Sequence, residues 1–200
     1  MWTAAILAGG QARRLGGADK SGLPIGGRPI LTRQLELVRG LTSHVLIVAN
    51  DGDRYREAGV PVVRDRIQGA GALGGLYTAL LEAPTPQVLV LACDMPFLTA
   101  PFLVRVMALS AGVDAAVPRD HRGLHPLCAA WSRRTAPHLA ARIAAGRLRI
   151  ADALAGLDVR EIGPDELAPL DPEGRLLMNV NTPDDYERAI RESVPQVTNH

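Results

Sequence analysis

The residues best suited to chemistry lie in the segment 7–20, which reads LAGGQARRLGGADK. Its glycines let the main chain approach a ligand and turn N–H groups toward it. Arg14 and Lys20 supply the positive charge that a polyphosphate needs, the first as a bidentate donor and the second as a point charge. The segment therefore predicts a phosphate-binding loop. The alternative is a glycine-rich turn that carries solvated basic residues.

Two familiar phosphate motifs do not fit this segment. The Walker motif needs a glycine directly before its Lys-Ser pair, whereas Asp19 precedes Lys20 and Ser21. The dinucleotide fingerprint Gly-x-Gly-x-x-Gly is not matched by glycine pairs at 9–10 and 16–17. We therefore expect a phosphate loop of another type.

Asp94 is the strongest candidate for a metal ligand. It follows the apolar run 88–91, and a carboxylate at the end of a buried strand is costly unless something pairs with it. Mg²⁺ at nucleotide sites is usually held by one or two carboxylates together with phosphate oxygens and water. The alternative role is to cap the helix that begins near Thr99, but Thr99 itself is better placed for that.

Other reactive residues form weaker patterns. His121 and His125 are four residues apart, but they flank Gly123 in an expected loop and no third ligand follows at zinc spacing. Cys93 adjoins Asp94 with no base beside it, and a free cysteine is usually a small buried residue. We expect neither a zinc site nor a cysteine nucleophile.

The elements that must position these residues alternate between short apolar runs and longer amphipathic segments. Strands are expected at 2–7, 45–48, 60–63 and 88–91, with weaker candidates at 115–117 and 127–131. Helices are expected at 29–39, 71–83 and 135–145, from about 99–101 onward, and from the capping sequence at 182–185 onward. This alternation predicts an α/β fold whose mostly parallel central sheet carries helices on both faces.

In such a sheet, ligands bind at the carboxyl ends of the strands, where the strand order reverses. The loops after Leu7, Val48 and Leu91 are therefore expected to form the site. No repeat or low-complexity linker interrupts the 200 residues, so one domain is expected over 1–194, with a loose tail at 195–200.

Composition excludes several classes of protein. A hydrophobic content of 47% and a charged content of 22% are those of an ordinary globular chain. A net charge of +1 without blocks of like charge gives no support for binding nucleic acid or a membrane surface. Two cysteines cannot build a disulfide framework and suit a reducing cytoplasm. No long apolar stripe is left over, so we expect a monomer.

The N-terminus gives no sign of a targeting segment. It lacks a positively charged stretch, and its apolar run ends at Gly9 and Gly10. It therefore reads as neither a signal peptide nor a spanning helix, and a cytoplasmic protein is expected.

The segment 7–20 resembles the signature of the nucleotidyltransferases that activate sugars and cofactors: Leu-Ala-Gly/Ala-Gly, three variable residues, Arg, a hydrophobic residue, Gly and a later Lys. Within that superfamily the chain is most similar to the molybdenum cofactor guanylyltransferases. Further matching segments follow in order: Asp65, GALGGL at 71–76, CDMPF at 93–97, HPL at 125–127 and NVNTP at 179–183. The matches extend over nearly the whole chain. Ala72 departs from them, because the family often has a proline there.

The resemblance implies a three-layer Rossmann-like nucleotidyltransferase fold that transfers GMP from GTP to the terminal phosphate of molybdopterin, with Mg²⁺ on Asp94. The implied catalytic residues are Asp94, Lys20 and Arg14. The implied nucleotide-binding residues are Leu7, Ala8, Gly9, Gly10, Lys20, Asn50, Asp65 and Asp94. The implied pterin-binding residues are His125, Arg147, Arg149, Asn179 and Asn181.

Alternatives remain at several of these positions. Arg147 and Arg149 could equally lie at a solvated helix end. Asn179 and Asn181 could simply belong to the loop that caps the last helix. The paired glycines at 9–10 are typical of the guanylyltransferase branch, whereas the cytidylyltransferase branch usually has Ala-Gly. The rival functions are a cytidylyltransferase or sugar-phosphate nucleotidyltransferase, and a non-catalytic nucleotide-binding protein of the same fold. A transient protein partner in cofactor delivery is also possible.

Overall fold

The computed structural model describes residues 1–8 and 22–193. Four predicted loop residues (Gly9, Gly10, Arg14 and Lys20) and the predicted tail at 195–200 lie outside the described residues. None of the described helices combines the length and the apolar character needed to cross a bilayer.

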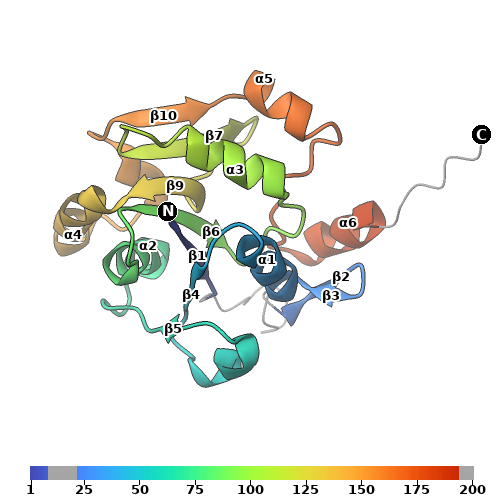
Figure 1. Cartoon of the computed structure of the whole chain (residues 1–200), viewed down its shortest axis with the longest axis horizontal. Helices are drawn as coiled ribbons and strands as arrows, with labels where there is room; N and C mark the ends of the chain where they lie inside the picture. The colour runs from blue at the N-terminus through green and yellow to red at the C-terminus, as the bar shows by residue number, and fades with distance from the viewer. Residues whose placement is uncertain (9–21, 194–200) are drawn as a thin grey trace, which may run out of the picture.

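The described chain alternates strands and helices (Figure 1). The strands are β1 (Thr3–Leu7), β2 (Pro24–Ile25), β3 (Arg28–Pro29), β4 (His44–Val48), β5 (Val62–Val63), β6 (Gln87–Ala92), β7 (Ala115–Asp120), β8 (Gly123–Leu124), β9 (Cys128–Ser132) and β10 (Val159–Ile162). The helices are α1 (Ile30–Arg39), α2 (Gly71–Glu82), α3 (Ala100–Ala108), α4 (Ala136–Ala144), α5 (Pro164–Leu167) and α6 (Pro183–Ser193). Short 3-10 turns fill Asp53–Ala58, Arg133–Thr135, Ile150–Leu154 and Ala168–Leu170.

The main sheet confirms the predicted α/β class. Its strand order is β10-β7-β9-β6-β1-β4-β5, with β8 paired to β7. Along that path β9 alone runs antiparallel to its neighbours, so the sheet is mostly parallel. The order reverses beside β1, because the chain passes from β1 to β4 and β5 on one side and then returns to β6 on the other.

The three layers follow from the strand pattern. Alternate side chains of the buried strands enter two separate hydrophobic clusters, one on each face of the sheet. On one face Ile6 and Ile47 pack with α1 and α3, and on the other Val90 and Trp131 pack with α2 and α4 (Figure 1). Each face is thus covered by helices, as predicted.

A third cluster fixes the C-terminal part of the chain. Ala189 of α6 packs with Ile25 of the β2–β3 hairpin and with Phe97, which follows β6. The predicted capping sequence begins α6: Thr182 Oγ1 accepts from the Asp185 N–H (3.1 Å), and Asp185 Oδ2 accepts from the Thr182 N–H (2.9 Å). The packing and the cap together bring residues 178–181 beside the loop after β6.

The strand β7 corresponds to the weaker candidate at 115–117, but other features of the fold were not anticipated. The short strands β2, β3 and β8 have two residues each, and the edge strand β10 mixes charged with apolar residues, so none of them shows an apolar run. Thr99 stands at the N-cap of α3, but its side chain makes no capping hydrogen bond.

Candidate active site

The carboxyl ends of the parallel strands bring four predicted residues to one edge of the sheet. Leu7 ends β1, Asn50 lies just after β4, Asp65 just after β5, and Asp94 just after β6. Parallel strands in register must end at the same edge, and β1 pairs with both β4 and β6. The reversal of strand order beside β1 therefore opens a ligand position at this edge.

These residues line a pocket of about 400 Å³, here called the first pocket. Its walls include Leu7, Asn50, Asp65, Asp94 and Gly75 of α2. A β-carbon added at Gly75 would lie 3.5 Å from Leu7 Cδ1 and 3.7 Å from Asp65 Oδ1. The bare backbone of α2 therefore leaves room for a ligand beside the Asp65 carboxylate.

Asp65 is positioned by Asn50. The Asn50 Nδ2 donates to Asp65 Oδ2 (2.9 Å), and the Asp65 N–H donates to Asn50 Oδ1 (3.3 Å). Burial raises the pKa of Asp65 above its usual value, and the hydrogen bond from Asn50 opposes that rise without cancelling it. The carboxylate is thus held in place, but the described residues do not fully compensate its burial.

Asp94 is tied to the C-terminal segment. The Asn179 Nδ2 donates to Asp94 Oδ1 (3.1 Å), and the Val180 N–H donates to the Asp94 carbonyl (2.8 Å). Burial raises the pKa of the neighbouring Cys128 thiol, and the Asp94 charge adds to the effect. Cys93 is also buried, as predicted, so neither cysteine has the features of an activated nucleophile.

A second pocket, of about 490 Å³, lies between the β7–β8 hairpin, α5 and the segment that leads into α6. Its charged walls include Arg119, His121, Arg122 and Arg188, and Leu177 and Met178 supply apolar surface. Arg119 pairs with Glu161 and Arg188 with Glu192, each at 2.8 Å. Arg122 makes no ion pair within 4 Å among the described residues.

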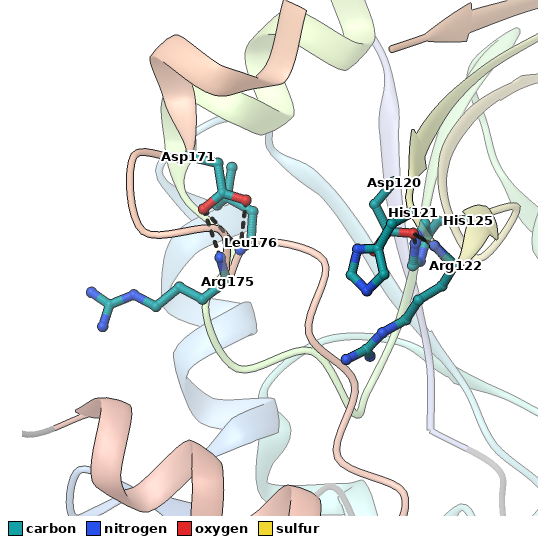
Figure 2. A network of polar contacts seen from close by, with 7 residues as sticks. All are labelled: Asp120, His121, Arg122, His125, Asp171, Arg175 and Leu176. Carbon is teal, nitrogen blue, oxygen red and sulfur yellow. Dashed lines mark hydrogen bonds and ion pairs between the residues drawn. The ribbon is translucent and has the colours of Figure 1, made fainter. Parts of the chain in front are cut away.

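The acidic residues of the second pocket are compensated within the protein. His125 Nε2 lies 2.9 Å from Asp120 Oδ1, and the Arg122 N–H donates to the same oxygen (2.8 Å). Burial alone would raise the pKa of Asp120, but these contacts outweigh it and hold the pKa below its usual value. Asp171 accepts the N–H groups of Arg175 and Leu176 (Figure 2). Figure 2 also shows the His121 and Arg122 side chains directed away from the hairpin.

Residues 4–158 match the family model described as "MobA-like NTP transferase domain". The chain belongs to this family. The molybdenum cofactor guanylyltransferase of Cereibacter sphaeroides is 35% identical over 189 residues, which cover 92% of this chain and 93% of that protein. The molybdenum cofactor guanylyltransferase of Desulfosudis oleivorans is 31% identical over 188 residues, with 94% and 93% covered.

A solved structure extends the likeness to the fold. The molybdopterin-guanine dinucleotide biosynthesis protein A of Archaeoglobus fulgidus superposes on the MobA-like chain with a TM-score of 0.82 at 28% identity. The match covers 96% of this chain and 98% of that one, so it includes the C-terminal segment that bonds to Asp94.

Of the ten predicted site residues that the structure describes, four line the first pocket and none lines the second. Leu7, Asn50, Asp65 and Asp94 line the first pocket. Ala8 continues the β1 edge, where its N–H donates to the Val48 carbonyl (2.9 Å).

The predicted pterin-binding residues fall into two groups. His125 and Asn179 contact Asp120 and Asp94, which line the second and first pockets respectively. The Asn181 N–H donates to Asp185 and so helps to begin α6 (3.0 Å). By contrast, Arg147 and Arg149 are exposed after α4 and line neither pocket.

Sequence reasoning did not single out Arg119, Arg122 or Arg188 of the second pocket. They come from a hairpin and from a helix more than sixty residues later in the chain. No local spacing links them. The only local signal is the charged run at 119–122, which reads equally well as a solvated turn.

Proposed function

We propose that this chain transfers GMP from GTP to the terminal phosphate of molybdopterin and releases pyrophosphate. The observation that carries the proposal is that two pockets of different chemistry meet the segment around Asp94. Asp94 lines the first pocket, and it bonds to Asn179 and Val180, which directly follow residues 177–178 of the second. Relatives more than 30% identical over nearly the full chain carry the name molybdenum cofactor guanylyltransferase.

The first pocket suits the guanine nucleotide. A carboxylate accepts hydrogen bonds from both N1–H and the exocyclic amine of guanine, a donor pair that cytosine and adenine lack. Asp65 offers that carboxylate, and its pKa is raised because the hydrogen bond from Asn50 offsets only part of the effect of burial. Binding of guanine would supply further donors. Arg14 and Lys20 follow β1 in the sequence, and we assign them to the phosphates of the nucleotide.

The second pocket suits the acceptor. Molybdopterin combines a flat heterocycle with an anionic phosphate monoester. The apolar surface of Leu177 and Met178 can cover the heterocycle, while His121 and Arg122 can receive the phosphate. Because Asp120 and Asp171 are already compensated by protein groups, they do not cancel the positive charge that Arg122 offers an anion.

Asp94 fits a Mg²⁺ ion that is completed by the substrates. Among the described residues no three acidic, histidine or cysteine side chains gather into a protein-only metal site. One carboxylate together with phosphate oxygens and water is the usual way in which Mg²⁺ binds at nucleotide sites. When bound, Mg²⁺ would neutralise charge on the phosphates. Asn179 occupies one side of the Asp94 carboxylate and so limits its rotation.

The reaction needs positioning more than acid–base chemistry. An oxygen of the acceptor phosphate forms a bond to the α-phosphorus, and the bond from that phosphorus to the bridging oxygen breaks. The electron pair of the broken bond leaves with pyrophosphate. A phosphate monoester is largely dianionic near neutral pH, so no protein base must remove a proton from it. The protein therefore has to align the two substrates across Asp94 and offset their charge.

The test is pyrophosphate release by the purified chain with molybdopterin, Mg²⁺ and each of GTP, CTP, ATP and UTP. We expect release with GTP and little with the others. The variant Asp65→Asn should lose most of this preference, because an amide presents only one oxygen to the two guanine donors. Asp51→Asn, the same change on an exposed neighbour, is the matched control and should keep it.

Each other outcome would identify a rival function. A preference for CTP would make the chain a cytidylyltransferase, and turnover with a sugar phosphate in place of molybdopterin would make it a sugar nucleotidyltransferase. Binding of GTP without any pyrophosphate release would indicate a non-catalytic nucleotide-binding protein.

A further inference from the structure

Gln34 is a buried polar residue that the proposed chemistry does not use. It lies in the middle of α1 and is only 2% exposed. Its side-chain amide nitrogen donates to the Ala92 carbonyl (2.9 Å) and to the Met95 carbonyl (3.0 Å). These two carbonyls stand on either side of Asp94 in the chain, so one side chain holds both ends of the turn that carries the carboxylate.

Both hydrogens of the Gln34 amide are used, whereas its oxygen Oε1 is buried and has no hydrogen-bond partner among the described residues. A buried acceptor without a partner destabilises the folded state. The polar contribution of Gln34 therefore lies in its two donors and the turn they hold.

The rest of the turn is tied from other directions. The Cys93 N–H donates to the Leu7 carbonyl (3.2 Å), and the Val180 N–H donates to the Asp94 carbonyl (2.8 Å). On the α1 side, Gln34 and Met95 are almost fully buried, although both line a surface hollow of about 460 Å³. The two hydrogen bonds of Gln34 therefore tie the turn to α1 beneath that hollow.

We propose that Gln34 is a positioning residue, which fixes the turn 92–95 so that the Asp94 carboxylate faces the first pocket in the orientation that binds a divalent cation with the nucleotide. The proposal rests on the proposed function, because it assumes that Asp94 binds the cation. Gln34 itself does not line the first pocket and is not expected to touch either substrate.

The test measures cation binding separately from turnover. Mn²⁺ is added to the protein with GTP, and free Mn²⁺ is followed by its electron paramagnetic resonance signal. Gln34→Met removes both donors at similar length, and Gln34→Glu replaces the donor nitrogen with an oxygen that faces two carbonyls. Gln87→Met, the same substitution at the opposite end of β6, is the matched control, and Asp94→Asn is the reference for loss of the ligand.

We expect both Gln34 variants to bind Mn²⁺ about ten-fold or more weakly, as is usual when a residue that orients a metal ligand is removed. GTP binding in the absence of divalent cations should be unchanged, since the first pocket keeps its walls. In turnover, kcat should fall and the Mg²⁺ requirement should rise while KM for GTP at saturating Mg²⁺ stays constant. If Gln34 contributed to stability alone, the variants would unfold at a lower temperature. Their Mn²⁺ affinity, kcat and Mg²⁺ requirement, measured well below that temperature, would then match the wild type.

The possible failures are distinguishable. If the wild-type chain with GTP retains no Mn²⁺, or if Asp94→Asn retains it equally well, the assignment of Asp94 fails and the role of Gln34 fails with it. If the wild-type chain retains Mn²⁺, Asp94→Asn does not, and the Gln34 variants match the wild type, only the role of Gln34 is overturned. Should Gln34→Met not fold, Gln34→Glu decides. If neither folds, Gln34 is a determinant of the fold and the proposal is wrong.

Discussion

The two pockets differ in how the protein treats their acidic residues. In the first pocket, burial raises the pKa of Asp65, and Asn50 supplies only part of the compensation. In the second, contacts from His125 and the Arg122 N–H outweigh burial and lower the pKa of Asp120. Among the described residues, one pocket compensates its buried carboxylate only in part, while the other compensates its acids and leaves Arg122 without an ion pair.

This difference indicates the ligand that each pocket is built for. A carboxylate whose burial is only partly compensated favours a ligand that brings N–H groups, as a guanine base does. An arginine whose neighbouring acids are already paired favours an anion, as a phosphate monoester is. Asp94 is assigned to neither the base nor the acceptor phosphate. It lines the first pocket but is hydrogen-bonded to the segment that follows the second. The contrast leads to four predictions.

The largest effect is expected at Asp94, which lines the first pocket and bonds to the segment that follows the second. Asp94→Asn keeps the shape of the side chain and an acceptor for Asn179 but removes the charge that we propose binds the cation. We expect kcat to fall about 100- to 1,000-fold, the usual loss when a major electrostatic contribution to the transition state is removed. Pyrophosphate release measures it. The exposed Asp184→Asn on α6 is the control, and an equal loss there would contradict the assignment.

The next largest effect distinguishes Arg122 of the second pocket from the exposed Arg147 and Arg149 as ligands of the acceptor. Arg122→Gln should raise KM for molybdopterin about ten-fold, since it removes one charge-assisted hydrogen bond, and should leave KM for GTP unchanged. Arg147→Gln and Arg149→Gln should change neither constant, because both residues lie outside the two pockets. The reverse result would support these two arginines as pterin ligands and separate the second pocket from the reaction.

These arginines also show how far the sequence could predict the site. Leu7, Asn50 and Asp94 stand in the loops that the predicted strands already placed at the site, whereas Asp65, two residues after β5, came only from the family resemblance. The second pocket joins a hairpin to a segment that runs from α5 to α6, and their contact depends on packing between distant parts of the chain. Periodicity carries no information about such contacts.

The same reasoning explains the elements that were anticipated and those that were not. The continuous apolar runs of β4 and β6 predicted buried parallel strands correctly. The edge strand β10 carries an arginine and a glutamate among its four residues, and its pairing with β7 comes from its place in the sheet. Gln34 falls on the buried face of α1, but nothing in the sequence indicates that its amide reaches the turn at Asp94.

Two adjacent glycines test the shape of the first pocket. A β-carbon at Gly74 would lie 2.8 Å from Ala70 Cβ and 3.2 Å from the Ile67 carbonyl oxygen, whereas Gly75 has room for one. We expect Gly74→Ala to destabilise the fold by about 1–3 kcal/mol, as overpacking does. Gly75→Ala should instead stabilise α2 by up to about 1 kcal/mol, because alanine favours the helix.

Gly75→Ala should weaken the binding of GTP. The added methyl group would stand beside Leu7 and Asp65, where the first pocket receives its ligand, so KM for GTP should rise although the fold is more stable. Denaturant unfolding and steady-state kinetics on the two variants measure both effects. Unchanged KM in Gly75→Ala would mean that the nucleotide does not approach this part of α2.

The smallest effect compares the two carboxylates directly through the pH dependence of stability. The folded-state pKa of Asp65 is raised above the ordinary value of 3.8, so its ionised form destabilises the fold. Asp65→Asn should therefore be slightly more stable than the wild type at pH 7. This advantage shrinks as the pH falls through the raised pKa and is gone below 3.8. Asp120 has the opposite sign, because its folded-state pKa lies below 3.8.

The two variants should consequently respond differently to acid. Asp120→Asn should be less stable than the wild type at pH 7, and this deficit should persist near pH 4. The stabilisation by the ionised Asp120 is lost only as the pH falls through its lowered pKa. His121, His125 and Arg122 face Asp120 and favour its charged form. Urea unfolding at pH 7, 5.5 and 4 checks both signs, with differences below about 1 kcal/mol expected for such partly exposed groups. If both variants shifted in the same direction at pH 7, the contrast between the pockets would not hold, and the incomplete compensation of Asp65 could no longer explain a preference for guanine.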